Sequence, residues 1–100
     1  MKIDTVPFDA AEFIQDAQSQ AEFITDAFDS GEAGYIAHAL GIVARARGMT
    51  QVSRDAGITR EALYRALSQE GDPRLSTLLG VLKALGLSLH AERLNDSEVA

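Results

Sequence analysis

The stretch MTQVSRDAGITREALYRAL, residues 49–67, constrains the fold most, because two short helical patterns are interrupted at residues 55–59. Glycine tolerates left-handed backbone, so Gly57 predicts a sharp turn between them. Thr50 is expected to cap a helix over 51–56, and Thr59 a second helix that ends near Leu67. Neither helix can bury much by itself, so the pattern predicts that the second one is held out toward a partner.

The second short helix has two unlike faces. At 100° per residue, one face holds Ala62, Leu63, Ala66 and Leu67, and the opposite face holds Arg60, Glu61, Tyr64 and Arg65. The second set can hydrogen-bond to base edges or phosphates, although an aromatic such as Tyr64 is also often half-buried against a neighbour. With the first helix laid across a DNA backbone, the predicted DNA contacts are Thr50, Gln51, Arg54, Thr59, Arg60, Glu61, Tyr64 and Arg65.

Charge is distributed unevenly along the chain, whose net charge is -6. Residues 1–34 hold eight acids against the single base Lys2, whereas residues 45–65 hold five arginines against two acids. This asymmetry predicts two unlike partners, one polyanionic and one basic. The alternative, that these charges only cover solvent-exposed faces, stays open.

The remaining patterns predict mostly helices. Asp9 with Glu12, and Ser19 with Glu22, have capping-box spacing, which predicts two short helices over the near-copies AEFIQDA (11–17) and AEFITDA (21–27). A further helix is expected from Ser30 to Arg47, ending at Gly48. Its buried stripe would be Ile36, Ala39, Leu40 and Val43.

The C-terminal third predicts one more helix and a strand. The helix is expected to begin at Asp72 and Pro73 and to end at Gly86. Its stripe would be Leu75, Leu78, Leu79, Leu82 and Leu85. The segment LSLHAERL, residues 87–94, alternates in part and predicts a short strand that pairs with its copy in a second subunit.

Several classes of protein are disfavoured. The chain of 100 residues has the size of one domain, contains no cysteine and no apolar run long enough to span a membrane, and becomes acidic too early for a signal peptide. We therefore expect a cytoplasmic protein. His38 and His90 lie far apart, and no phosphate loop or nucleophile elbow is present, so neither an enzyme nor a metal or other cofactor is expected.

Two levels of resemblance follow from these residues. Val52, Ser53, Ala56, Gly57, Ile58, Thr59 and Leu63 together resemble the helix-turn-helix of the lambda-repressor-like class (Cro/C1, or XRE), although that class usually has alanine where Ser53 stands. Residues 37–89, with FDAAEF upstream, resemble the probable addiction-module antidote proteins related to the HigA antitoxins. Together these segments cover about nine tenths of the chain.

The resemblance implies an all-α, lambda-repressor-like helix-turn-helix bundle with an N-terminal helical extension and a short C-terminal strand. The expected segments are an acidic helical segment (1–30), a DNA-binding domain with the strand (31–94) and a tail (95–100). It also implies a bacterial antitoxin, associated with the nucleoid, that neutralises a basic RelE/HigB-like ribonuclease toxin. As a homodimer on an inverted-repeat operator, it would repress its own operon.

Within the acidic segment, the expected toxin contacts are Phe8, Glu12, Phe13, Asp16, Phe23 and Asp26. These acids and aromatic residues suit a basic partner that normally binds RNA. The alternative is a stand-alone repressor of the Cro/C1 type without a toxin partner.

Overall fold

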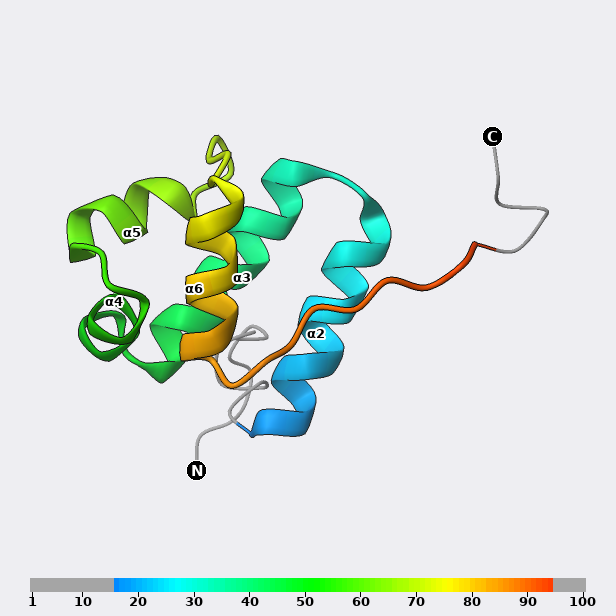
Figure 1. Ribbon diagram of the computed structural model, residues 1–100, viewed down its shortest axis with the longest axis horizontal. Coiled ribbons are helices and arrows are strands. Elements are labelled where there is room, and N and C mark those ends of the chain that lie inside the picture. Colours follow the sequence, from blue (N-terminus) through cyan, green and yellow to red (C-terminus); the bar gives the residue numbers. More distant parts are fainter. Residues whose placement is uncertain (1–15, 95–100) are drawn as a thin grey trace, which may run out of the picture.

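A computed structural model describes residues 16–94 (Figure 1). In this range the chain forms helices α2 (Ala17–Ser30), α3 (Ala33–Arg47), α4 (Met49–Ala56), α5 (Arg60–Ala66) and α6 (Leu75–Ala84). The all-α prediction agrees with these elements, while the helix expected after Asp9 lies outside the described residues. Residues 87–94, here named the C-terminal arm, are extended and form no strand in this single chain. Their predicted pairing with a second subunit stays a prediction.

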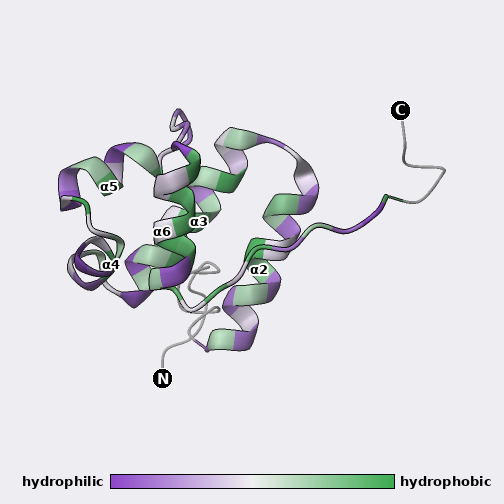
Figure 2. Ribbon diagram, in the orientation of Figure 1, coloured by the Kyte–Doolittle hydropathy of each residue, from purple (hydrophilic) through white to green (hydrophobic). Residues whose placement is uncertain are grey.

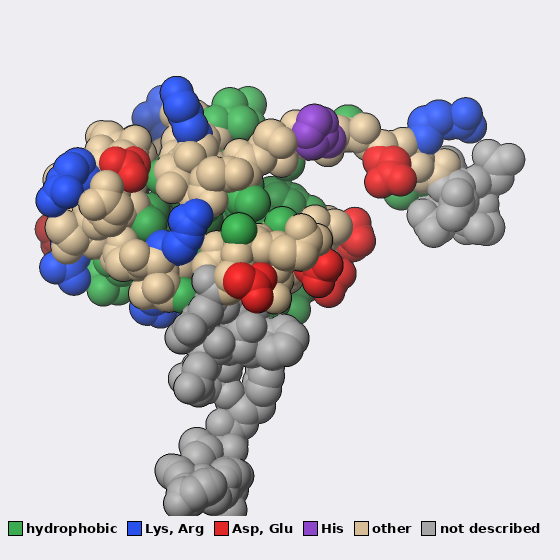
Figure 3. All heavy atoms as spheres, turned by 90° about the horizontal axis from the view of Figure 1, so that it is seen from below, with side chains coloured by type: hydrophobic (Ala, Val, Ile, Leu, Met, Phe, Trp, Pro, Cys, Tyr) green, Lys and Arg blue, Asp and Glu red, His purple; other side chains and the backbone are tan. Residues whose placement is uncertain are grey.

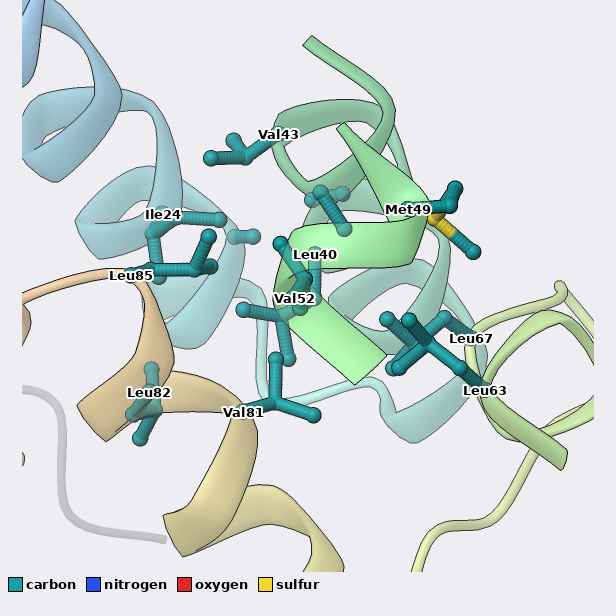
Figure 4. Close-up of a cluster of buried hydrophobic side chains, with 13 residues drawn as sticks. Ile24, Leu40, Val43, Met49, Val52, Leu63, Leu67, Val81, Leu82 and Leu85 are labelled. Atoms are coloured by element: carbon teal, nitrogen blue, oxygen red, sulfur yellow. The ribbon is translucent and has the colours of Figure 1, made fainter. Parts of the chain in front are cut away.

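One hydrophobic core joins all five helices (Figure 4). Leu40 and Val43 of α3 lie at its centre with Val52 of α4, Leu63 of α5 and Val81 of α6, and none of these side chains is more than 2% exposed. α2 packs on α3, and α6 packs on α4. Hydrophilic positions recur along α2 and α4, whereas α6 is mostly hydrophobic (Figure 2). Each helix therefore contributes one face to a shared core.

The start of α2 differs from the sequence prediction. Asp16, not Ser19, is the N-cap: the Ser19 N–H donates to Asp16 Oδ1 at 2.7 Å, and Ser19 lies inside the helix. A carboxylate at this position accepts from the free amides of the first turn, so the helix gains one turn at its N-terminus. The second of the two near-copies is therefore one part of a longer helix of 14 residues.

A buried polar contact ties α2 to the rest of the molecule. The side chain of Gln20 is only 2% exposed, and its Oε1 accepts a hydrogen bond from Arg47 Nε at 3.2 Å. Arg47 Nη2 also donates to the carbonyl oxygen of Leu85 at 2.7 Å. Because buried polar groups require partners, Arg47 satisfies one from α2 and one from the end of α6.

α3 ends at Arg47 before Gly48, as predicted. The buried face holds Ala39, Leu40 and Val43, and Ile36 is partly buried against the core. Gly41 is also buried in this helix, where a Cβ atom would lie 2.6 Å from the carbonyl oxygen of Leu67. The middle of α3 is thus in close contact with the backbone just after α5.

α6 begins at Leu75, with Arg74 as its N-cap, so the predicted start at Asp72 and Pro73 was wrong. The predicted stripe was also partly wrong, because Leu75 and Leu79 are 64% and 47% exposed. Val81 is fully buried, so the inward face is centred nearer Val81 and Leu85 than the leucine spacing suggested. Two leucines of α6 therefore remain on the surface.

Candidate functional site

α4 and α5 are joined by the tight turn that the sequence predicted. Gly57 has φ 77°, and its N–H donates to the carbonyl oxygens of Ser53 (2.9 Å) and Arg54 (3.2 Å). The N–H of Ile58 donates to the same Ser53 oxygen at 3.1 Å. A residue with a side chain would be strained at this positive φ, so glycine allows the chain to leave α4 and enter α5 within three residues.

The beginning of α4 corrects one predicted role. α4 starts at Met49 with Gly48 as its N-cap, and Thr50 is an exposed residue inside the first turn with no capping hydrogen bond. Met49 is only 6% exposed, so its side chain is part of the core and the helix begins two residues earlier than predicted. The prediction of Thr50 as a cap was therefore wrong, although its side chain still lies on the surface.

α5 has the two faces that its sequence predicted. Thr59 Oγ1 accepts from the Ala62 N–H at 3.0 Å, which caps the helix. Leu63 is fully buried and Leu67 is 2% exposed, while Ala62 and Ala66 are partly buried. Burial of these residues holds α5 on the core with its other face in solvent.

The outward face of α5 carries two arginines, an aromatic ring and a carboxylate. Arg60, Glu61, Tyr64 and Arg65 are all exposed, and Tyr64 is 43% exposed. Arg60 Nη2 lies 3.4 Å from the Tyr64 hydroxyl, and its guanidinium carbon lies 5.7 Å from the centre of the Tyr64 ring. This cation–π arrangement keeps both side chains on the same exposed surface.

The predicted contact residues of α4 are exposed but engaged with one another. Gln51 Nε2 lies 3.0 Å from both carboxylate oxygens of Asp55, and Arg54 Nη1 donates to Gln51 Oε1 at 3.3 Å. A phosphate contact by the Gln51 amide would replace its bond to Asp55. Thr50 and Gln51, in the first turn of α4, and Arg54, one turn later, are nevertheless all exposed.

α2 presents a face of the opposite charge. Its acids Glu22, Asp26 and Asp29, together with the cap Asp16, are exposed, and the helix contains no lysine or arginine. Two of these carboxylates have neutral partners: the Gln18 amide donates to Glu22, and hydrogen bonds from Ser19 hold the pKa of Asp16 below its ordinary value. We name Glu22, Asp26 and Asp29 the acidic ridge.

In Figure 3, most Lys and Arg side chains gather over one end of the helical body, with some Asp and Glu among them, and other Asp and Glu side chains gather toward the opposite end. Of the predicted toxin contacts, Asp16 and Asp26 are exposed, whereas Phe23 is partly buried and packs against the core. Phe8, Glu12 and Phe13 lie outside the described residues. α2 therefore uses both of its aromatic residues, Phe23 and Phe28, for packing and offers mainly carboxylates to a partner.

A groove between α2 and the C-terminal arm was not foreseen from the sequence. Its volume is about 820 Å³. It is lined by Ala21, Ile24, Thr25, Phe28 and Asp29 of α2, by Leu82, and by residues of the arm from Leu87 to Leu94. The spacing of Ala21, Ile24 and Phe28 places them on one helical face, but the sequence does not reveal that the arm runs past this face.

Two further observations concern residues 16–94. No helix in this range is long and apolar enough to cross a membrane. Within the same residues, no three His, Cys, Asp or Glu side chains gather closely enough to hold a metal ion.

The fold and the two charged surfaces define a small all-helical protein with an exposed pair of short helices and an acidic helix on one core. Residues 4–93 match the family model of the "Probable addiction module antidote protein", and the chain belongs to this family. It is similar to an uncharacterized protein of Haemophilus influenzae, with 40% identity over 86 residues that cover 86% of this chain and 89% of the relative. No solved structure matches the chain.

Membership of this family gives the chain an antitoxin role and implies a toxin partner. Antidote proteins of addiction modules are in general not enzymes.

Proposed function

We propose that this protein is the antitoxin of a type II toxin–antitoxin module. It neutralises a basic RelE/HigB-like ribonuclease toxin and, as a dimer on an inverted-repeat operator, represses its own operon. The observation that carries this proposal is the presence of two surfaces of opposite charge on one core, the acidic ridge of α2 and the outward face of α5.

The geometry of α4 and α5 supports the DNA-binding half. α5 is the helix that enters the major groove, where Arg60 and Arg65 reach base edges or phosphates and Tyr64 stacks beside Arg60. Thr50, Gln51 and Arg54 of α4 contact the DNA backbone. Thr59 and Glu61 lie at the N-terminal end of α5. In a dimer the two α5 helices lie about 34 Å apart, one turn of DNA.

The composition of α2 supports the toxin-binding half. A ribonuclease that binds mRNA presents cations to its substrate, and the acidic ridge offers those cations carboxylates instead. Asp16, Phe23 and Asp26 are proposed contacts on α2 and its cap, and we keep Phe8, Glu12 and Phe13, which lie outside the described residues, as further proposed contacts. Because antidote proteins act on a toxin, family membership favours this function over a stand-alone repressor.

The proposal is tested with two pairs of variants that damage one surface each. Arg60→Ala and Arg65→Ala should each weaken operator binding by about 1 to 3 kcal/mol, as expected for an arginine that reads a base. They should leave co-purification with the toxin from the neighbouring gene unchanged. The readouts are titration of operator DNA by fluorescence anisotropy and pull-down of the co-expressed toxin.

The second pair is Glu22→Lys and Asp26→Lys. Reversal of these exposed charges should reduce toxin binding and protection of growing cells, and the loss should diminish at high salt, since screening weakens exposed charge contacts. Operator affinity should stay the same or rise. If both charge reversals leave toxin binding intact and the α5 variants abolish it, the toxin binds the α4–α5 surface and the proposed division of the two surfaces is wrong.

A further inference from the structure

Asp55 is an acid at a position where a helix disfavours one. It lies in the last turn of α4, which ends at Ala56 and carries the negative end of the helix dipole there. Its side chain is exposed, so packing in the core does not account for it. Glu61, the other acid among residues 45–65, lies in the first turn of α5, where the dipole favours a negative charge. Helix stability therefore gives no reason for a carboxylate at residue 55.

The Asp55 carboxylate has a single partner among residues 16–94. Both of its oxygens lie 3.0 Å from Gln51 Nε2, one helical turn earlier. Arg54, the neighbouring cation, donates to Gln51 Oε1 at 3.3 Å and forms no ion pair with Asp55 in this part of the chain. Spacings of three and four residues place the three side chains on one exposed face of α4. Both polar ends of the Gln51 side chain are therefore engaged.

Gln51 is the residue through which Asp55 can act on DNA binding. The amide of Gln51 is a proposed phosphate contact, and it would have to leave Asp55 in order to donate to a phosphate. Hydrogen bonds to a charged acceptor are stronger than those between neutral groups, so this bond has a measurable cost when it breaks. Asp55 and a DNA phosphate thus compete as acceptors for the same amide.

We infer that Asp55 is a positioning residue that lowers the affinity of α4 for the DNA backbone by holding the Gln51 amide. Phosphates are present in every DNA sequence, whereas the bases that α5 contacts differ from one sequence to another. With the backbone contacts of α4 weakened, stable binding requires the base contacts of α5. The inference rests on the proposed function for the placement of α4 along the DNA backbone.

The first test is a double-mutant cycle on DNA affinity. Fluorescence anisotropy gives the dissociation constants of wild type, Asp55→Ala, Gln51→Ala and the double variant. Each is measured on operator DNA and on an unrelated duplex of equal length, at about 0.15 M salt, where distant exposed charges are screened. We expect Asp55→Ala to bind both duplexes about three- to tenfold more tightly than wild type. In the Gln51→Ala background the same change should raise affinity less than about twofold, because no amide remains to be released.

Glu32→Ala is the matched control for the loss of a negative charge. Glu32 is exposed, forms no capping hydrogen bond with its side chain, and lies at the opposite end of the 15-residue helix α3 from α4. We expect its removal to leave both dissociation constants unchanged. The inference is overturned if Asp55→Ala binds DNA no more tightly than wild type. It is also overturned if Asp55→Ala gains as much affinity in the Gln51→Ala background, since Asp55 would then act by charge repulsion alone.

The second test detects the hydrogen bond in the free protein. The side-chain amide of Gln51 gives a pair of signals in a nitrogen–proton correlation spectrum, which the Gln51→Ala spectrum identifies by their absence. We expect Asp55→Ala to shift this pair of signals, and operator DNA to shift it in the wild-type protein. If the pair does not move on loss of Asp55, the two side chains do not interact in solution and the inference is overturned.

These tests separate the inference from the proposed function. If Asp55→Ala gains affinity through Gln51 and Arg60→Ala weakens operator binding, both stand. If Asp55→Ala gains nothing while Arg60→Ala still weakens operator binding, only the inference fails. If Asp55→Ala gains affinity for both duplexes but Arg60→Ala and Arg65→Ala leave operator binding unchanged, only the proposed role of α5 fails. A wild-type protein that binds neither duplex overturns both.

Discussion

α2 and α5 carry the two charged surfaces, yet they are attached to the core in different ways. α2 has 14 residues, begins at a charged cap and buries Gln20, Ile24 and Ala27. α5 has seven residues and buries only Leu63 within the helix, with Leu67 directly after it. An isolated helix of seven residues is unstable in water, and one of 14 is marginal. Tertiary packing therefore maintains both surfaces, and α5 depends on it more.

α2 and α5 pack on the same core, so we expect them to unfold together. Ile24 of α2 and Leu63 of α5 belong to the same cluster of buried side chains, and Arg47 bonds α2 to the end of α6. The sequence analysis placed a boundary between an acidic segment (1–30) and a DNA-binding domain (31–94). Because α2 shares its core with the helices that follow, this boundary is a proposal about function. Loss of packing at either helix should therefore destabilise the whole fold.

The largest expected effect comes from removal of buried leucine or isoleucine side chains. Leu63→Ala and Ile24→Ala should each lower the free energy of unfolding by about 2 to 5 kcal/mol, because each leaves a cavity in the shared core. Chemical denaturation followed by circular dichroism should give a single transition for both variants. A separate early transition in Ile24→Ala alone would mean that α2 unfolds independently, which would contradict the single cooperative core.

The next effect tests how closely the end of α5 approaches α3. Gly41→Ala should destabilise the fold by about 1 to 3 kcal/mol, because the added Cβ would lie 2.6 Å from the carbonyl oxygen of Leu67. Helix propensity alone predicts the opposite sign, a gain of about 1 kcal/mol. Ala46→Gly, at an exposed position of the same helix, is the matched control and should cost about that amount. A Gly41→Ala protein more stable than wild type would show that the backbones can separate at no cost.

The smallest effects come from the two helix caps. Thr59→Ala should lower the free energy of unfolding by about 0.5 to 2 kcal/mol through loss of the hydrogen bond from the Ala62 N–H, and should weaken operator binding as α5 frays.

Asp16→Ala should lower the melting temperature at neutral pH. Since folding lowers the pKa of Asp16, its contribution is present above the ordinary carboxyl pKa and is lost as the pH falls through the lowered value. In thermal melts, the difference in melting temperature between wild type and Asp16→Ala should shrink as the pH falls. The difference between wild type and Thr59→Ala should not depend on pH.

Several features of this protein follow from spacing along the chain. The turn at Gly57, the cap at Thr59 and the two faces of α5 were all predicted correctly, because each depends on residues within one helical turn. The separation of acids from arginines is likewise a property of the sequence, and the fold carries it onto two surfaces.

Only the tertiary structure decided which apolar side chains are buried and where backbones meet. Leu75 and Leu79 fit the periodicity of a buried stripe but face solvent, because the packing of α6 on α4 sets which face turns inward. Met49 joins the core and moves the start of α4, which no local pattern indicates. Gly41 and the groove beside the arm depend on segments far apart in sequence, and so periodicity, which describes one helix at a time, could not predict them.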